Sequence, residues 1–235
     1  MSSVVLYQHL DLGDEIICNG LVREYCRHYD QVTIFAKFHN YASVVFMFRD
    51  LRNLTIIKGD RIFAKIFIFV NAFRIGTSKY DEVKTIGFPN LDWDGEPFEK
   101  QYYKNGGVDF IKKWDSFYVK RDFSREQALF DKIAPRENYA FLHDDSSRNF
   151  TIDRKRIDQK YTVIFPERNL TDNVFDYCTL IEKAKEIHVI DSSFMFLIDC
   201  LPYHNPSQKL FVHRYARVGP IWTLPVLKKN WQILS

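Results

Sequence analysis

Short apolar segments alternate with segments of helical spacing along most of this chain, and this alternation limits its fold more than any other feature. The first series of apolar segments reads "VVLY", "QVTIFAK", "LTIIKG" and "EVKTIGF", and the second reads "YAFLH", "YTVIF", "EIHVI" and "KLFVH". Strands that alternate with helices are typical of parallel sheets covered by helices on both faces. The sequence therefore predicts an α/β protein with two Rossmann-like halves.

One segment of the first half is open to two interpretations. "DRIFAKIFIFVNAF" has Asp60 as a candidate N-cap and is expected to be a helix, although its aromatic and β-branched residues also suit a strand. Its apolar run is interrupted by Lys65 and is too short to span a bilayer. We therefore expect no transmembrane segment.

Between the two halves, the segment from about 89 to 135 is rich in aromatic, charged and turn-forming residues. We predict an N-terminal domain over 1–120 that carries most of this segment and a C-terminal domain over 121–235, with a helix expected at 124–133. Aromatic side chains in the segment suit an acceptor platform, a homodimer contact or ordinary core packing, and the sequence does not choose between these roles. They are Trp93, Tyr102, Tyr103, Trp114 and Phe117.

Composition removes several classes of function. The chain of 235 residues has a net charge of only +3, with basic and acidic residues interspersed, so nucleic-acid binding is not expected. The four cysteines form no CxxC pair, which predicts reduced thiols and neither a disulfide framework nor a zinc site. No signal-type segment opens the sequence, so the expected location is the cytoplasm.

A turn after the first predicted strand carries two acids. "LYQHLDLGDEIICNGLVREY" runs from the strand through Gly13 to Asp14 and Glu15 and then into helical spacing. Ligands of parallel α/β sheets bind at the carboxyl ends of strands, where such turns lie, and a carboxylate there can take a proton from an incoming hydroxyl. We assign Asp14 as the candidate general base and Glu15 to the acceptor site. The alternative is that Asp14 only stabilises the positive end of the helix dipole.

A second candidate site follows the strand "EIHVI". Ser192 and Ser193 are favoured helix caps, and the free N–H groups and positive dipole end of the next helix attract anions. A phosphate or diphosphate would fit this turn. The simpler alternative is a pair of serines that only cap the helix.

Two further strand ends carry polar residues. In "FLHDDSSR", Arg148 can hold a phosphate with a fork of donors, and His143 can hydrogen-bond a ligand oxygen. The two adjacent acids of this loop suit magnesium or manganese, but such pairs more often form a solvated turn, so we predict no metal site. Glu167, in "FPERN", can meet a ribose hydroxyl.

Together these motifs resemble those of GT-B type glycosyltransferases of the heptosyltransferase-like kind. "LGDEIICNGLVREY" resembles the turn in which the acid after glycine is the proposed catalytic base, and the matching residue is Asp14. "AKEIHVIDSSFMFLIDCL" resembles the strand, turn and helix that hold the donor diphosphate, and the matching residues are Asp191, Ser192, Ser193 and Phe194. The resemblance covers residues 1–60 and 138–202, and small glycosyltransferase-like proteins of bacteria and large DNA viruses share it. This chain departs from the family pattern where Ser192-Ser193 replaces the usual threonine-glycine.

The resemblance implies two Rossmann-like domains that face a cleft, with a nucleotide-sugar donor on the second domain and a glycan or sugar hydroxyl acceptor on the first. It implies metal-independent transfer with no cofactor besides the donor, in the cytoplasm of the cell or, for a viral protein, of the host. Arg217, after the last predicted strand, is assigned to the acceptor side, and a C-terminal helix usually packs back across the first domain in this family. Two alternatives stay open: a sugar-nucleotide epimerase or hydrolase on the same fold, and a non-catalytic nucleotide- or glycan-binding protein.

Overall fold

The chain forms two compact units. Unit 1 comprises Met1–Lys120 and Thr223–Val226, and unit 2 comprises Arg121–Trp222 and Leu227–Ser235. The predicted domains did not include the return of a short C-terminal stretch to unit 1. The computed structural model describes residues 1–8, 10–73, 80–87, 91–92, 95–135, 137–145, 148–167, 169–217 and 223–235. Trp93 and the two serines of "HDDSSR" lie outside these ranges.

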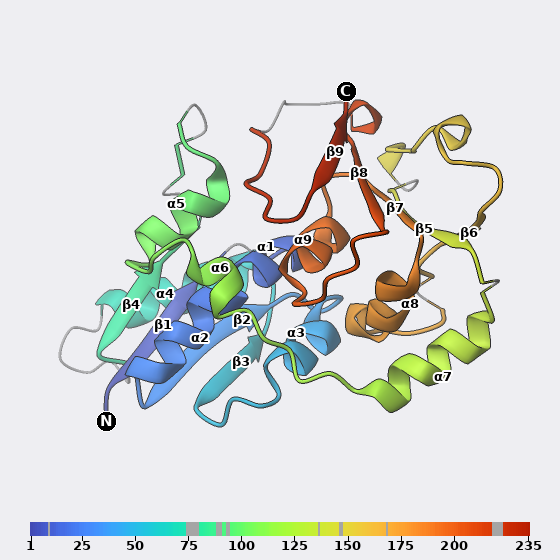
Figure 1. Ribbon diagram of the computed structural model, residues 1–235. Helices are drawn as coiled ribbons and strands as arrows, with labels where there is room; N and C mark the ends of the chain where they lie inside the picture. The colour runs from blue at the N-terminus through green and yellow to red at the C-terminus, as the bar shows by residue number, and fades with distance from the viewer. Residues whose placement is uncertain are drawn as a thin grey trace. The chain divides into compact units, whose positions relative to one another are not determined.

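Unit 1 contains a four-stranded sheet in the order β3-β2-β1-β4, and all three strand pairs are parallel (Figure 1). The strands are β1 (Ser3–Tyr7), β2 (Gln31–Ala36), β3 (Leu54–Lys58) and β4 (Glu82–Thr85). Every residue of β1 is buried, as expected of a central strand covered on both faces. These strands coincide with the four apolar segments of the first series, so the predicted parallel sheet is confirmed.

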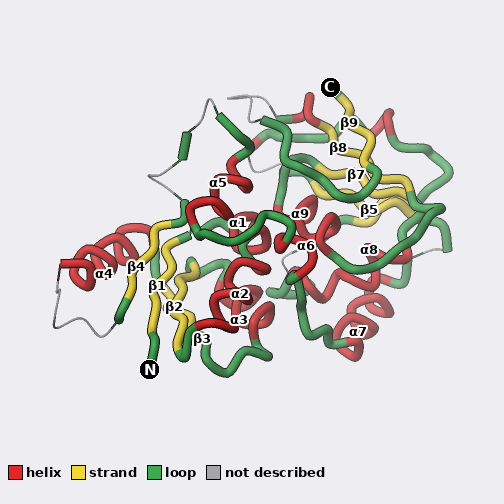
Figure 2. Tube along the Cα trace, turned by 60° about the vertical axis from the view of Figure 1, so that its left-hand side comes forward, coloured by secondary structure: helices red, strands yellow, loops and turns green. Residues whose placement is uncertain are grey.

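Helices cover both faces of this sheet. They are α1 (Leu12–Ile17), α2 (Asn19–His28), α3 (Tyr41–Phe48), α4 (Arg61–Phe73), α5 (Phe98–Asn105) and α6 (Lys112–Asp115). Figure 2 shows α4 on one side of the strands and α2 and α3 on the other. The Asp60 side chain accepts a 2.8 Å hydrogen bond from the Phe63 N–H, which is the predicted N-cap of α4. The helical interpretation of this segment is therefore confirmed.

The aromatic-rich segment folds onto α1 and α2 within unit 1. Tyr102, Tyr103 and Phe117 are buried. The Tyr103 hydroxyl donates to the Ile17 carbonyl oxygen (2.9 Å) and accepts from the Leu21 N–H (3.2 Å). Of the three roles that the sequence left open, core packing is the one that these three side chains fill.

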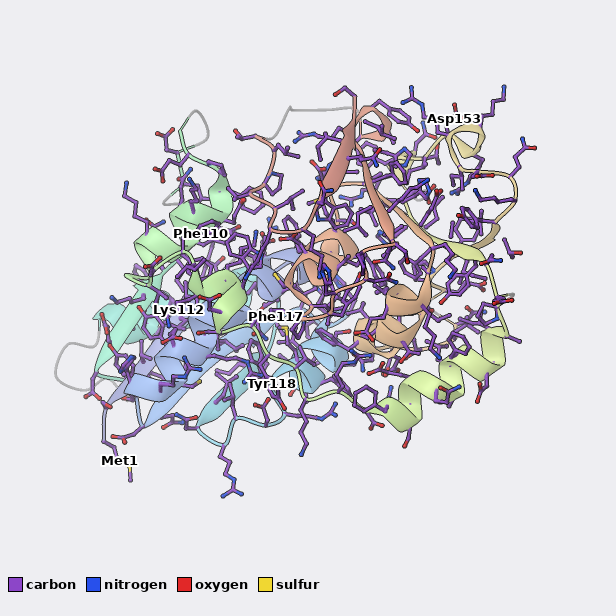
Figure 3. All side chains as sticks on the ribbon, viewed as in Figure 1. Met1, Phe110, Lys112, Phe117, Tyr118 and Asp153 are labelled. Atoms are coloured by element: carbon purple, nitrogen blue, oxygen red, sulfur yellow. The ribbon has the colours of Figure 1, made fainter. Side chains whose placement is uncertain are left out.

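The same segment runs close against the backbone of α2. Figure 3 labels Lys112, Phe117 and Tyr118, which lie beside this helix. The Asn19 side chain pairs with the backbone of Tyr118 through one donated bond (3.2 Å) and one accepted bond (3.0 Å). A Cβ atom at Gly20 would lie 1.9 Å from the Lys112 carbonyl oxygen, so only glycine permits this approach.

We therefore expect Gly20→Ala to destabilise the protein, because the added methyl group must push α6 away from α2. Overpacking of this kind costs about 1–3 kcal/mol. Chemical denaturation would measure the loss, with Val45→Ala on the exposed side of α3 as the control for a change in methyl content. Equal stability of the two variants would contradict the close approach.

Unit 2 contains a five-stranded sheet in the order β6-β5-β7-β8-β9, with all four strand pairs parallel. The strands are β5 (Tyr139–His143), β6 (Thr162–Ile164), β7 (Glu186–Val189), β8 (Lys209–His213) and β9 (Trp231–Leu234). The first four coincide with the second predicted series, which confirms that series. β9 was not predicted.

The C-terminal stretch forms this edge strand, and residues 223–235 contain none of the helix expected from the resemblance. Asp199, at the end of the preceding helix, holds the stretch in place. Its carboxylate accepts from the Lys228 N–H (2.9 Å), the Lys229 N–H (3.0 Å) and the Trp231 indole N–H (3.0 Å). These bonds position the chain so that β9 pairs with β8 in parallel.

The helices of unit 2 are α7 (Phe123–Ile133), α8 (Cys178–Lys183) and α9 (Ser193–Cys200), with 3-10 turns η2 (Arg154–Arg156), η3 (Val174–Tyr177) and η4 (Arg214–Ala216). The predicted helix at 124–133 is α7, and Asp122 caps it by accepting from the Arg125 N–H (3.1 Å). In neither unit is any described helix long and apolar enough to cross a lipid bilayer.

A chain of buried polar side chains crosses the β7–β8 pair. His188 lies between the Glu186 carboxylate (3.2 Å) and the His213 ring (2.9 Å), and the other ring nitrogen of His213 lies 2.9 Å from the Tyr215 hydroxyl. If each hydroxyl or ring N–H donates toward Glu186, both imidazoles are neutral and fully hydrogen-bonded. Burial lowers the pKa of both histidines, and that of His213 falls to about 4, helped by the charges of His188, Arg156 and Arg154. Neutral imidazoles therefore belong to the folded state.

This arrangement predicts a loss of stability on acidification. Between pH 6.5 and 4 an unfolded histidine binds a proton that folded His213 does not, so the free energy of unfolding falls as the pH drops through this window. His213→Gln removes the titrating group, and we expect its melting temperature to fall less than that of the wild type across these pH values. Parallel curves for the two proteins would contradict this role of His213.

Candidate functional site

Each sheet has one place where the strand order reverses, and ligands of open α/β sheets bind outside the carboxyl ends of the strands there. In unit 1 the chain moves from β1 to β2 and β3 and then returns to β4 on the other side of β1. In unit 2 it moves from β5 to β6 and returns to β7. The two switch points are therefore β1/β4 in unit 1 and β5/β7 in unit 2.

Asp14 lies in the first turn of α1, directly after β1, at the switch point of unit 1. It is half-buried, and its Oδ1 accepts a 2.8 Å hydrogen bond from the Tyr102 hydroxyl. Burial, together with the negative charge of Asp14, raises the pKa of Tyr102 well above its usual value, so the phenol remains a donor. A tyrosine from α5 thus orients the candidate base. No local sequence signal marks this partner, because it lies 88 residues away in the chain.

Glu15 has a different environment from its neighbour. Its side chain is 0% exposed, and its Oε2 accepts a 2.8 Å hydrogen bond from the Gln8 amide. Burial raises the pKa of Glu15 well above its usual value. This position does not support the predicted contact of Glu15 with an acceptor, because no solvent-accessible surface is left on the side chain.

Charged residues from three strand ends meet beside α1. Asp11 follows β1 and pairs with Lys37, which follows β2, and with Arg61 (2.9 Å), which follows β3. Asp11, Lys37 and Arg61 were not among the predicted site residues. The signal that could have found them is their shared position just beyond predicted parallel strands, whose carboxyl ends lie at one edge of the sheet.

At the switch point of unit 2, His143 at the end of β5 meets the turn after β7. Its Nδ1 lies 2.9 Å from the Ser192 hydroxyl, and its ring lies 4.6 Å from that of Phe194. Ser192 is the N-cap residue of α9, but its side chain makes no capping hydrogen bond to the helix backbone. The Ser192 hydroxyl therefore hydrogen-bonds His143 and does not cap the helix, so the simpler alternative, a serine that only caps α9, does not describe Ser192. Ser193 begins α9 and is half-buried.

Asp191 precedes these serines and contacts two arginines. Arg217 donates a 2.8 Å hydrogen bond to the Asp191 carbonyl oxygen, and an Arg214 nitrogen lies 3.6 Å from the Asp191 carboxylate. The carboxylate is 8% exposed, and its Oδ1 accepts no hydrogen bond from the described residues. Burial raises the pKa of Asp191, and the two arginines oppose this shift. Arg217 was assigned to the acceptor side, but it lies in unit 2 with the predicted donor residues.

A third arginine lies near the same point. Arg148 is 64% exposed and pairs with Asp145 (2.5 Å). The Arg148 and Arg217 guanidinium carbons lie 5.5 and 5.9 Å from the centroid of the Phe150 ring, and Arg214 contacts the same aspartate as Arg217, so the three cations lie close together. We call Arg148, Arg214 and Arg217 the arginine cluster. Its cations, together with the N-terminal end of α9, favour binding of an anion.

Glu167 lies apart from this cluster, in the loop after β6, and its side chain is exposed. The Tyr177 hydroxyl holds the loop, since it accepts from the Glu167 N–H (2.8 Å) and donates to the Glu167 carbonyl oxygen (2.9 Å). The carboxylate is therefore accessible at a fixed place. Throughout the described ranges, no three His, Cys, Asp or Glu side chains come together in the way that metal ligands would.

A pocket of about 440 Å³ lies elsewhere in unit 1, between α2 and the segment that follows α6. Its wall includes Arg23, which forms a 2.9 Å ion pair with Asp50 and a hydrogen bond to the Met47 carbonyl oxygen (3.1 Å). The charge of Arg23 is thus already neutralised. Phe117, one of the aromatic residues considered for an acceptor platform, lines this pocket, but none of the predicted catalytic or donor-binding residues does.

No protein-family model matches this sequence, and no curated protein matches it either. Several solved structures are similar to it, including the following two. The glycosyl transferase family 9 protein of Veillonella parvula is 9% identical, with 90% of this chain and 80% of that chain covered and a TM-score of 0.55. The ADP-heptose LPS heptosyltransferase II of E. coli is 10% identical, with 100% and 90% covered and a TM-score of 0.55. The chain therefore has the α/β fold of these structures, with two parallel sheets, and the predicted GT-B type fold is confirmed.

Proposed function

We propose that the protein is a glycosyltransferase that moves a sugar from a nucleotide-sugar donor to a hydroxyl of a glycan or sugar acceptor. The observation that carries this proposal is the arginine cluster beside Asp191 and the start of α9 at the switch point of unit 2. Three guanidinium groups and a helix N-terminus suit the diphosphate of such a donor. The likeness to glycosyltransferase structures supports the same reaction class.

In this proposal the donor binds to unit 2. Arg148 and Arg217 hold diphosphate oxygens, and Ser192 and Ser193 offer hydroxyls beside the α9 N–H groups. His143, oriented by Ser192, hydrogen-bonds a donor oxygen, while Phe194 supports its ring. Glu167 is exposed after β6 and can accept from a ribose hydroxyl.

The acceptor hydroxyl is activated in unit 1. Asp14 takes the proton from this hydroxyl. At the same time the hydroxyl oxygen attacks the anomeric carbon of the donor sugar, and the bond between that carbon and the diphosphate oxygen breaks. Tyr102 holds the Asp14 carboxylate in one orientation. The arginine cluster stabilises the charge that develops on the leaving diphosphate, without a metal ion.

Donor binding is tested first with ADP, UDP and GDP as probes. A ligand that binds only the folded state raises the melting temperature, and we expect one of the three to do so with excess chelator present. Each of Arg148→Ala and Arg217→Ala removes a charge-assisted hydrogen bond and should weaken binding roughly 10- to 100-fold by calorimetry. Arg52→Ala, an exposed arginine of unit 1, is the matched control. Binding by none of the probes at millimolar concentration, or binding only with a divalent metal, would refute this donor site.

Catalysis is tested with Asp14→Asn. The amide cannot accept the proton, so acceptor-dependent release of the nucleoside diphosphate should fall roughly 100- to 10,000-fold, while donor affinity stays unchanged. Glu15→Gln is the control, because the Glu15 side chain is 0% exposed and its replacement is isosteric, so this variant should retain activity.

The same assay separates the rival functions. Release that is independent of every acceptor in a panel of monosaccharides and oligosaccharides would identify a hydrolase, and isomerisation of the donor would identify an epimerase. Donor binding without turnover, unaffected by Asp14→Asn, would identify a binding protein.

A further inference from the structure

Helix α4 is apolar on the side that faces solvent as well as on the side that faces its sheet. Its inner side chains, Ala64, Phe67 and Ile68, pack against the core over β1 and β2. On the opposite side, large apolar residues are exposed: Ile62 (69%), Phe63 (46%), Ile66 (58%), Phe69 (62%) and Val70 (39%). We call these five residues the outer face of α4.

These side chains form one continuous surface. Ile66 follows Ile62 by four residues, and Phe69 and Val70 follow Ile66 by three and four, so they are neighbours along one stripe of the helix. Figure 2 shows α4 at the margin of the unit 1 sheet, beside β4. Single exposed apolar residues are ordinary, but a contiguous patch of this kind marks a surface that binds something.

Basic side chains border the patch, and the acids near it lie at the helix start, where Asp60 is the N-cap and Asp11 pairs with Arg61. Lys65 is exposed on α4 between Ile62 and Phe69, and Arg61 opens the helix and is 46% exposed. Near the helix start, Lys58 at the end of β3 lies 5.4 Å from the ring of Phe38, which is itself 65% exposed. The sequence of α4, "RIFAKIFIFVNAF", contains no acid.

Charge complementarity therefore selects the partner. An apolar stripe of Phe, Ile and Val with a basic border suits a bilayer surface that carries anionic lipid headgroups. A second copy of the chain fits less well, because two such helices in symmetric antiparallel contact would bring their basic edges together with no carboxylate on α4 to pair with them. At 13 residues, α4 is also shorter than the roughly 20 that span a bilayer, and its inner side is held by the sheet.

We propose that the outer face of α4 docks unit 1 onto an anionic membrane surface, with the helix lying in the plane of the headgroups. The apolar side chains enter the interface, and Lys65 and Arg61 meet lipid phosphates. This inference does not depend on the proposed transferase function, since it uses no residue of the donor site or of the proton transfer.

The test is flotation of the full chain with vesicles. We expect the protein to float with vesicles that contain phosphatidylglycerol and phosphatidylcholine and less so with pure phosphatidylcholine, and high salt should weaken the effect. Ile66→Ser with Phe69→Ser should abolish flotation, and Lys65→Glu should weaken it at least several-fold. Both double-variant positions are exposed, so the melting temperature should not fall. Phe123→Ser, which removes a comparably exposed aromatic ring (68%) from α7, is the matched control and should float like the wild type.

The proposal would be overturned if the wild type floated with neither kind of vesicle, or if the wild type and the double variant floated equally. Sedimentation velocity identifies the rival partner. A wild-type dimer that the double variant converts to monomer, without flotation of either protein, would assign the outer face to a second copy of the chain.

Discussion

Parallel pairing between strands that are not consecutive in the chain is the constraint on which both candidate sites depend. β5 pairs with β7, and the Ile190 N–H donates to the His143 carbonyl oxygen at 3.2 Å, so the ends of these two strands are fixed beside each other. That pairing brings His143 within 2.9 Å of Ser192 although 49 residues separate them. In unit 1, β1 pairs with β4 in the same way, and this pairing forms the switch point beside which α1 begins. Neither site can form before its crossover has closed.

The geometry of a single helical turn divides the two acids that follow β1. Successive residues of a helix point in directions about 100° apart, so neighbouring side chains cannot share one environment. Glu15 is fully buried, and burial raises its pKa, whereas Asp14 stays half-buried against a tyrosine hydroxyl. A buried charge without a partner is costly, so the environment leaves Asp14 as the acid of the pair that solvent can reach.

The sequence predicted what local patterns determine. Eight strands are visible as apolar runs, and the turn at 191–194 is visible as polar residues between a strand and a helix. The contacts of the site are less visible because they are made by residues distant in the chain. Tyr102 cannot be told apart from the other aromatic residues in the sequence, because its contact with Asp14 forms only in the fold. Arg217 was assigned to the acceptor side, but it lies beside Asp191, among the donor residues. β9 was missed since Asp199, and not an apolar run, holds the stretch that leads to it.

The two switch points differ in chemistry although their strands are arranged alike, and this difference bears on function more than the shared fold does. Unit 2 collects guanidinium groups around a helix N-terminus, which favours a polyanion. Unit 1 presents a carboxylate with a phenol donor, which cannot hold a phosphate but can accept a proton from a hydroxyl. A protein that only binds a nucleotide has use for the first arrangement and none for the second. An enzyme with two substrates, one anionic and one neutral, has use for both, and this asymmetry favours the transferase over a binding protein.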